Sequence, residues 1–194
     1  KKNKIEVLSF AKKSGLKIPE TIITNNVQLI NENEYITKPL DGPIGIQYGN
    51  FFYVTYTTLI KKIQNKILPS LIQKKINKKY EIRTYYLDGE CYSMAIFSQN
   101  DKQTQIDFRE YNYNKPNRNI PYKLPLEIEE KLKKMMDGLQ LKTGSIDIIK
   151  GTDGEYYFLE VNPVGQFGMT SKPCNYNLEK ITYNKIIEYD KSFK

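Results

Sequence analysis

The sequence predicts an α+β fold, in which antiparallel strands and helices occupy separate stretches of the chain. Asp88-Gly89 separates two apolar segments of strand length, and this dipeptide is one of the strongest hairpin signals. A second pair of apolar runs, 144–149 and 156–163, flanks a turn rich in Gly and Asp. Residues 126–139 carry apolar side chains at helical spacing. Two hairpins and an amphipathic helix that lies between them in sequence indicate this fold class.

The N-terminal part of the chain is expected to contain one helix and one extended segment. Apolar residues in 4–14 recur at helical spacing, and Gly15 supplies a helix end. Residues 16–24 are extended. Residues 27–34 are too few for a stable helix, so a loop is expected there.

A strand, 34–39, is followed by a loop, 41–50, that contains three glycines. These are Gly42, Gly45 and Gly49. Glycines allow backbone N–H groups to approach phosphate oxygens, and a plain hairpin loop is the alternative. Lys38, within the strand, is either an edge charge or a phosphate ligand. Residues 51–60 alternate aromatic and Thr side chains and predict a strand, and 66–76 leads from a short helix into another strand.

The hairpin around Asp88-Gly89 consists of strands 80–87 and 90–97. Glu81 and Arg83 project from the same face of its first strand, because side chains alternate along a strand. An ordinary surface pair is one interpretation. Arginine is rare in this lysine-rich chain, which suggests that its planar guanidinium is needed where it occurs.

Three segments in the second half of the chain complete the prediction. Residues 98–123 are polar and Asn-rich and form a long loop around the motif 106–109. Residues 163–174 are also expected to be a loop. Residues 176–189 predict a final helix.

Composition excludes several kinds of catalyst. The 194 residues contain no histidine, so Ser-His-Asp and Cys-His mechanisms are excluded within this chain. Cys91 and Cys174 are far apart and lack metal-ligand spacing, which favours a reduced, cytoplasmic setting. No apolar run is long enough to span a membrane. The net charge of +8 suits nucleic acid, nucleotides or an acidic peptide.

Three polar residues interrupt the apolar hairpin that starts at residue 144. Glu160 and Asn162 project from one face of their strand, and Asp147 lies on the partner strand. Oxygen-bearing side chains are costly to bury among apolar residues unless a cation lies between them. Mg²⁺ prefers such ligands and leaves room for phosphates. The alternative is that all three side chains point to solvent.

The order of these segments resembles the ATP-grasp ligases. Gly144 to Asp147, with Leu159-Glu160-Val161-Asn162-Pro163, is similar to their metal-binding core. Asp107-Phe108-Arg109 and residues 162–168 resemble the ATP-grasp peptide maturases that make graspetides, which are ω-ester- or ω-amide-linked peptides. Residues 168–177 resemble the grasp-with-spasm branch of that family. The resemblance covers nearly the whole chain.

The resemblance implies an ATP-grasp fold, with two α+β subdomains that grip ATP. We expect residues 1–25 to join an N-terminal pre-ATP-grasp domain, which is absent from this sequence, to the rest. Residues 26–76 would be the subdomain with the phosphate lid, and 77–194 the subdomain with the metal site. A homodimer is also expected.

The resemblance further implies ATP and Mg²⁺ as cofactors and assigns a role to each site residue. Lys38 would contact the phosphates, and Gly42 and Gly45 would belong to the lid. The adenine hinge would be Gln73, Lys74, Lys75 and Ile76. The metal ligands would be Asp147, Glu160 and Asn162. Arg83 would steady the γ-phosphate, Arg109 would position the substrate carboxylate, and Asp107 or a substrate carboxylate would be the base.

The implied activity is phosphorylation of Asp or Glu side chains of a ribosomal precursor peptide, followed by macrocyclisation. One alternative is an ATP-grasp ligase that adds amino acids to a peptide or protein. Another is a basic nucleic-acid-binding module without enzymatic activity, which requires clustered basic and aromatic residues. Lysine is instead spread widely, so we expect a peptide partner and neither nucleic acid nor membrane.

Overall fold

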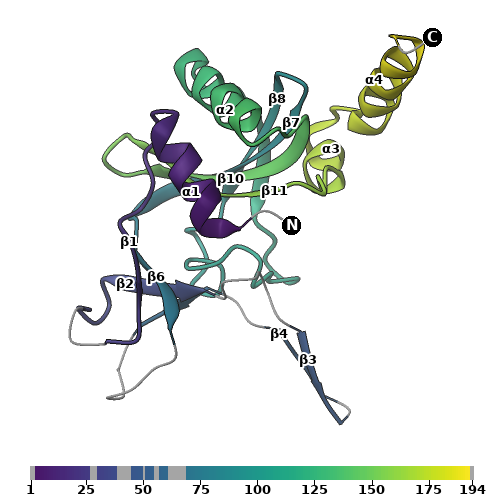
Figure 1. The fold of residues 1–194 in the computed structure, drawn as a ribbon. Helices are drawn as coiled ribbons and strands as arrows, with labels where there is room; N and C mark the ends of the chain where they lie inside the picture. The colour runs from purple at the N-terminus through teal and green to yellow at the C-terminus, as the bar shows by residue number, and fades with distance from the viewer. Residues whose placement is uncertain are drawn as a thin grey trace.

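The computed structural model describes residues 3–26, 30–38, 45–49, 51–54, 57–60 and 69–192. These residues form a five-stranded sheet, a four-stranded sheet, and a two-stranded hairpin that extends away from both (Figure 1). All pairs between the strands described here are antiparallel, and one isolated parallel bridge joins Lys17 to Tyr157. Strands and helices are largely segregated, so the α+β class is confirmed.

The larger sheet has the strand order β11-β10-β7-β8-β9. Its strands are β7 (Lys78–Leu87), β8 (Glu90–Phe97), β9 (Arg118–Tyr122), β10 (Thr143–Gly151) and β11 (Tyr156–Asn162). Helices α1 (Lys4–Lys13) and α2 (Leu126–Gly138) cover one face of this sheet (Figure 1). Two further helices, α3 (Gly168–Cys174) and α4 (Leu178–Ser192), follow β11.

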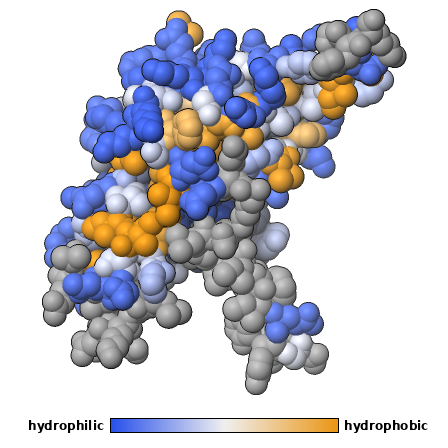
Figure 2. Space-filling view, in the orientation of Figure 1, coloured by the Kyte–Doolittle hydropathy of each residue, from blue (hydrophilic) through white to orange (hydrophobic). Residues whose placement is uncertain are grey.

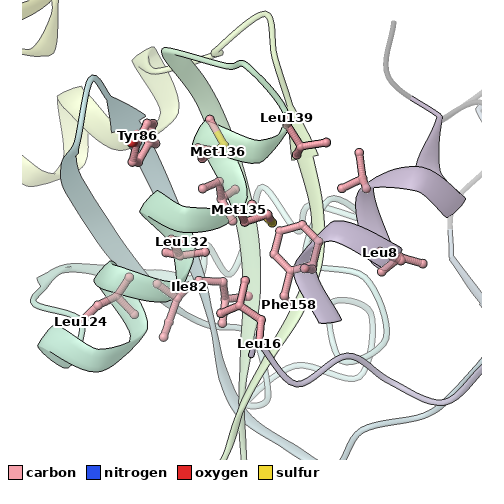
Figure 3. Packing of buried hydrophobic residues seen from close by; sticks show 14 residues of the cluster. Leu8, Leu16, Ile82, Tyr86, Leu124, Leu132, Met135, Met136, Leu139 and Phe158 are labelled. Carbon is pink, nitrogen blue, oxygen red and sulfur yellow. The ribbon is translucent and has the colours of Figure 1, made fainter. Parts of the chain in front are cut away.

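The main hydrophobic core lies between this sheet and its two helices. Figure 3 shows Leu132 and Met135 of α2 near Phe158 of β11, with Leu8 of α1 on the other side. Ile82 of β7 belongs to the same cluster. Because side chains alternate along each strand, the polar neighbours of these core residues project from the opposite face of the sheet. That face carries the candidate site.

The smaller sheet has the order β1-β6-β2-β5. Its strands are β1 (Thr21–Thr24), β2 (Tyr35–Lys38), β5 (Thr58–Leu59) and β6 (Ser70–Lys74). A small core of Ile30, Tyr35 and Ile72 packs within it. Figure 2 shows apolar residues concentrated over this sheet, whereas most of the visible surface above the larger sheet is hydrophilic. The separate hairpin consists of β3 (Gly45–Tyr48) and β4 (Phe51–Val54).

Four predicted segments differ from the structure. The expected loop 41–50 contains strand β3. The expected loop 98–123 contains the edge strand β9, where Pro121 is tolerated because one side of an edge strand needs no N–H donor. The expected loop 163–174 contains α3. The single strand predicted for 51–60 is two strands, β4 and β5, in different sheets.

The first helix, predicted for 4–14, spans Lys4–Lys13 in the structure. Val7, Leu8 and Ala11 are buried, whereas Ile5 is about half exposed. The helix begins at the cap Asn3, whose side chain accepts a hydrogen bond from the Ile5 N–H at 2.8 Å. Within the described part of the chain, no helix is both long and apolar enough to cross a membrane.

Candidate active site

The register of the larger sheet brings three predicted site residues side by side. Asp147 of β10 lies directly opposite Glu160 of β11 on one side and opposite Arg83 of β7 on the other. Ile82, Ile146 and Ile148, which flank Arg83 and Asp147, belong to the core under α1 and α2, and Val161, next to Glu160, packs against that core. A register shift between Asp147 and Ile148 leaves Leu159 without a partner on β10, so Phe158 can lie in the core although Glu160 faces the other way. Asp147, Glu160 and Arg83 therefore project from the opposite face, toward the smaller sheet.

Arg83 and Asp147 form a buried ion pair. Arg83 Nη1 lies 2.8 Å from Asp147 Oδ1 and 3.1 Å from Asp147 Oδ2. The side chains are 6% and 15% exposed. Burial raises the pKa of Asp147 to about 6, against the opposing effect of Arg83, and the nearby Glu160 raises it further. The alternative interpretation, in which Glu81 and Arg83 form an ordinary surface pair, does not hold, because Arg83 is buried against Asp147.

Glu160 faces three cations. Lys4 Nζ of α1 lies 3.5 Å from Glu160 Oε2. Burial alone would raise the pKa of Glu160, but Lys38, Lys4 and Arg109 together lower it. Burial lowers the pKa of Lys38 to about 8, although Glu160 opposes this effect. The site therefore combines two carboxylates with an excess of positive charge, which suits a ligand with several negative charges.

Arg109 is held in a fixed orientation by Asp107. Arg109 Nε donates to Asp107 Oδ1 at 2.8 Å, and Nη2 donates to Oδ2 at 2.6 Å. Asp107 also accepts hydrogen bonds from the backbone N–H groups of Arg109 and Thr57, each at 3.1 Å. The hydrogen bond from Thr57 connects the loop at 98–117, between β8 and β9, to the segment that leads into β5.

A pocket between the two sheets collects most of these groups. Lys38, Gln73, Lys74 and Ile76 line it from the smaller sheet and the segment that follows β6. Asp107, Arg109, Asp147 and Glu160 line it from the larger sheet and the 98–117 loop. Residues from widely separated parts of the sequence thus surround one cavity.

Gln73, Lys74 and Ile76 of the predicted hinge line this pocket, whereas Lys75 does not, and two backbone donors of the hinge are already in use. The Lys74 N–H donates to the Glu20 carbonyl at 2.9 Å, and the Lys75 N–H donates to the Glu34 carbonyl at 2.7 Å. Gln73 is fully buried, and its Nε2 donates to Thr21 Oγ1 at 3.0 Å. The backbone N–H groups of Lys74 and Lys75 are therefore not free to bind a ligand, and the hinge role of this segment stays a prediction.

Four predicted site residues do not line this pocket, namely Arg83, Lys75, Gly45 and Asn162, and a fifth lies outside the described residues. Gly45 begins β3 and pairs with Val54 in the separate hairpin. Asn162 ends β11 opposite Ser145, and its Oδ1 accepts a hydrogen bond from the Val164 N–H at 3.1 Å. Gly42 is not among the described residues.

The sequence did not indicate a second buried polar group at the pocket. Lys78 pairs with Glu81, which also accepts a hydrogen bond from Ser98 Oγ. Lys78 Nζ additionally donates to the Ile106 carbonyl at 3.1 Å. Burial raises the pKa of Glu81 despite these partners. Lys78 is the first residue of β7, outside the predicted strand 80–87, and the fold brings its partners together.

The residues present fit a hard cation by their chemistry. Asp147 and Glu160 are adjacent across the hairpin, and Asn162 shares the Glu160 face. Carboxylate and amide oxygens are the ligands that Mg²⁺ prefers. Among the described residues, no group of three His, Cys, Asp or Glu side chains is arranged to hold a metal ion. A site with three protein ligands would therefore need the amide of Asn162 in addition to the two carboxylates.

Comparison with known proteins places this geometry in a known fold. No protein-family model matches the chain. Two curated relatives are the α-aminoadipate–LysW ligases LysX of Sulfolobus acidocaldarius and Sulfurisphaera tokodaii, each 26% identical. The alignments include 97% of this chain and 71% and 68% of those relatives.

Solved structures give closer matches. A Chryseobacterium gregarium RiPP-associated ATP-grasp ligase, in complex with ADP and a leader and core peptide, is 30% identical with a TM-score of 0.76. The macrocyclase MdnC of Microcystis aeruginosa, bound with precursor peptide MdnA, is 28% identical with a TM-score of 0.65. The matches cover 84% and 85% of this chain but 52% and 54% of those chains. The chain thus spans about half the length of the solved structures that it matches.

These likenesses show that the chain has the ATP-grasp fold. Within that fold, they confirm the resemblance to the peptide maturases, because the two solved structures are a RiPP-associated ligase and a macrocyclase. The curated relatives and solved neighbours support the prediction of an ADP-forming ligase. The roles of individual residues stay predictions.

Proposed function

We propose that this chain carries the nucleotide and metal site of a ligase that closes macrocycles in a ribosomal precursor peptide. The observation that supports this most strongly is the pocket between the two sheets. It brings Lys38, Arg109, Asp147 and Glu160 together without histidine. Such a set can neutralise the charge that develops during phosphoryl transfer.

The proposed reaction has two steps. An oxygen of an Asp or Glu side chain of the peptide attacks the γ-phosphorus of ATP, and ADP leaves. A hydroxyl or amine of the same peptide then attacks the carbonyl carbon of the acyl phosphate. Phosphate leaves with the bond electrons, the nucleophile loses its proton, and an ω-ester or ω-amide bond remains. Each closed ring removes one water from the peptide.

The side chains have distinct proposed roles in these steps. Lys38 binds the phosphates from the smaller sheet. Arg109, oriented by Asp107, holds the substrate carboxylate and then the acyl phosphate. Arg83 positions Asp147 and adds positive charge behind it. Mg²⁺ bound by Asp147, Glu160 and Asn162 would neutralise phosphate charge and orient the leaving ADP.

The contacts of Asp107 argue that it positions Arg109 and is not the base. Its carboxylate already accepts four hydrogen bonds, two from the Arg109 guanidinium and two from backbone N–H groups. Burial would raise its pKa, but these partners lower it below the ordinary value. A second carboxylate of the substrate is therefore the better candidate for proton removal.

A precursor peptide rich in Asp and Glu complements the net charge of +8. The proposed location is the cytoplasm, where ATP is available and Cys91 and Cys174 stay reduced. The second candidate function is addition of an amino acid to a peptide carboxylate, which the LysX relatives favour.

Mass spectrometry after incubation with ATP, Mg²⁺ and a candidate precursor peptide that carries Asp or Glu separates these functions. Macrocyclisation predicts loss of one water per ring, together with ADP. Ligation of a free amino acid predicts a mass gain that appears only when that amino acid is present. An unchanged peptide with no ADP formed would contradict both.

A further inference from the structure

A second pocket lies on the other side of Phe108 and Arg109. Both residues line this second pocket and also the pocket between the two sheets, where the nucleotide is proposed to bind. They therefore form the wall between the two pockets. The remaining apolar lining comes from β8, the 98–117 loop and α3. These residues are Met94, Ile96, Tyr111, Met169 and Pro173. The pocket is therefore adjacent to the proposed position of the substrate carboxylate.

The inner part of the second pocket is apolar and well packed. Met94 and Ile96 are fully buried and belong to one hydrophobic cluster with Phe108. The outer part is open: Met169 of α3 is 46% exposed and Tyr111 is 42% exposed. The space is about 460 Å³, enough for a large side chain. A well-packed floor with an open rim is typical of a preformed binding pocket.

The polar groups of this pocket fit a peptide chain. Arg109 keeps a partly exposed guanidinium at the wall, although Asp107 occupies part of it. Asn117 Nδ2 and Asn119 Oδ1 are buried, and within the described part of the chain neither has a hydrogen-bond partner. One is a donor and the other an acceptor. Together they match the C=O and N–H groups of a peptide, and a buried polar group without a partner is costly.

We propose that this pocket binds an aromatic or large aliphatic side chain of the substrate peptide, one or two residues from the carboxylate that Arg109 holds. Consecutive Cα atoms are about 3.8 Å apart, so only near neighbours of that carboxylate can reach a pocket that shares its wall. The inference rests on the proposed function and adds a sequence requirement to it. The substrate motif is a large apolar residue beside Asp or Glu.

The absence of tryptophan from this chain allows a direct binding test. Two peptides of identical composition are compared, one with Trp next to its single Glu and one with Trp six Gly or Ser residues away. Fluorescence of the peptide Trp is titrated with protein in the presence of ADP and Mg²⁺. We expect a blue shift and at least about tenfold tighter binding for the adjacent peptide.

Two variants test whether the peptide binds in this pocket. Met169→Glu places a carboxylate at the rim and should weaken binding of the adjacent peptide to the level of the separated one. Ile186→Glu is the matched control, because Ile186 is 60% exposed on α4 and lies outside the pocket. It should leave binding unchanged. Equal affinity for the two peptides, or equal effects of the two variants, would overturn the inference.

Two further readouts separate this inference from the proposed function. If the native precursor is processed but the two peptides bind equally, the pocket assignment fails and the proposed function stands. If the adjacent peptide binds selectively but no precursor is processed, the proposed function fails. A change in sedimentation of Met169→Glu without any change in peptide binding would show that this pocket contacts a second copy, which also overturns the inference.

Discussion

Arg83 and Asp147 face each other across strands β7 and β10, with Arg83 Nη1 within 3.1 Å of both oxygens of Asp147. On the other side of Asp147, Glu160 of β11 lies directly opposite it. Asp147 is therefore set between a cation and a carboxylate on the polar face of the sheet. This arrangement fixes the carboxylate and limits the repulsion between two buried acids.

The ion pair makes a prediction about stability. Arg83→Leu should lower the free energy of unfolding by about 3–5 kcal/mol, because it leaves the buried Asp147 without its cation. The double variant Arg83→Leu/Asp147→Leu should recover much of that loss, since neither charge remains. Urea denaturation of the single and double variants provides the measurement. A double variant less stable than Arg83→Leu alone would contradict the assignment of a buried pair.

Glu160 should be needed for turnover and not for folding or peptide binding. Glu160→Gln keeps the size of the side chain but removes a proposed metal-ligand charge, so we expect precursor-dependent ADP formation to fall by about 100-fold or more. Glu155→Gln is the control, because Glu155 is exposed and pairs with Lys17 at the surface. If Glu160→Gln lost peptide binding and turnover equally, its role would be structural.

Nucleotide affinity should depend on pH through Lys38. Its pKa is lowered to about 8, chiefly by burial, and a bound phosphate would raise it. Above pH 8, where Lys38 of the free protein is mostly neutral, nucleotide binding therefore requires Lys38 to take up a proton. Affinity should be constant from pH 7 to about 8 and fall at higher pH, by up to about tenfold per pH unit. Calorimetric titration with ADP and Mg²⁺ measures this.

Lys38→Arg separates this effect from other titrations. Arginine stays charged throughout the range, so the variant should show no loss of affinity between pH 8 and 9.5. A wild-type profile that is flat above pH 8, or a variant profile with the same slope as the wild type, would contradict the role of Lys38.

Gly144 should be required because a side chain there would collide with the facing strand β11. A Cβ at this position would lie 2.8 Å from Val161 Cγ2 and 3.3 Å from the Asn162 carbonyl oxygen. Gly144→Ala should therefore cost about 1–3 kcal/mol and displace the end of β11. Gly168→Ala is the control, since its Cβ would meet nothing within 4 Å. Thermal denaturation should show a lower midpoint for Gly144→Ala only.

Local sequence signals predicted the hairpins and α2 because these depend on short-range chemistry. Asp88-Gly89 specifies a tight turn, and the spacing of Leu132, Met135 and Met136 specifies a buried helix face. Strand β9 and helix α3 were missed because each contains a proline that argues against regular structure. Pro121 lies on a sheet edge, and Pro173 lies near the end of a short helix.

The site was predictable in its residue types but not in its contacts. Asp147 and Glu160 stood out as acids in an apolar hairpin, and their opposition follows from the register of that hairpin. The ion pair of Lys4 with Glu160 joins residues at distant points of the chain. The predicted division of the chain into 1–25, 26–76 and 77–194 stays a prediction. Within 1–25, α1 packs on the larger sheet, whereas β1 pairs with β6 of the smaller sheet. The homodimer also stays a prediction.

The central claim is that ATP activates a side-chain carboxylate of the precursor, and an oxygen label tests it most directly. The precursor is prepared with ¹⁸O in its Asp and Glu side chains and incubated with the protein, ATP and Mg²⁺. The acyl-phosphate route predicts one ¹⁸O in each released phosphate, with one water lost per ring. Phosphate that contains no ¹⁸O while the peptide still cyclises, or ATP hydrolysis with an unchanged peptide, would contradict it.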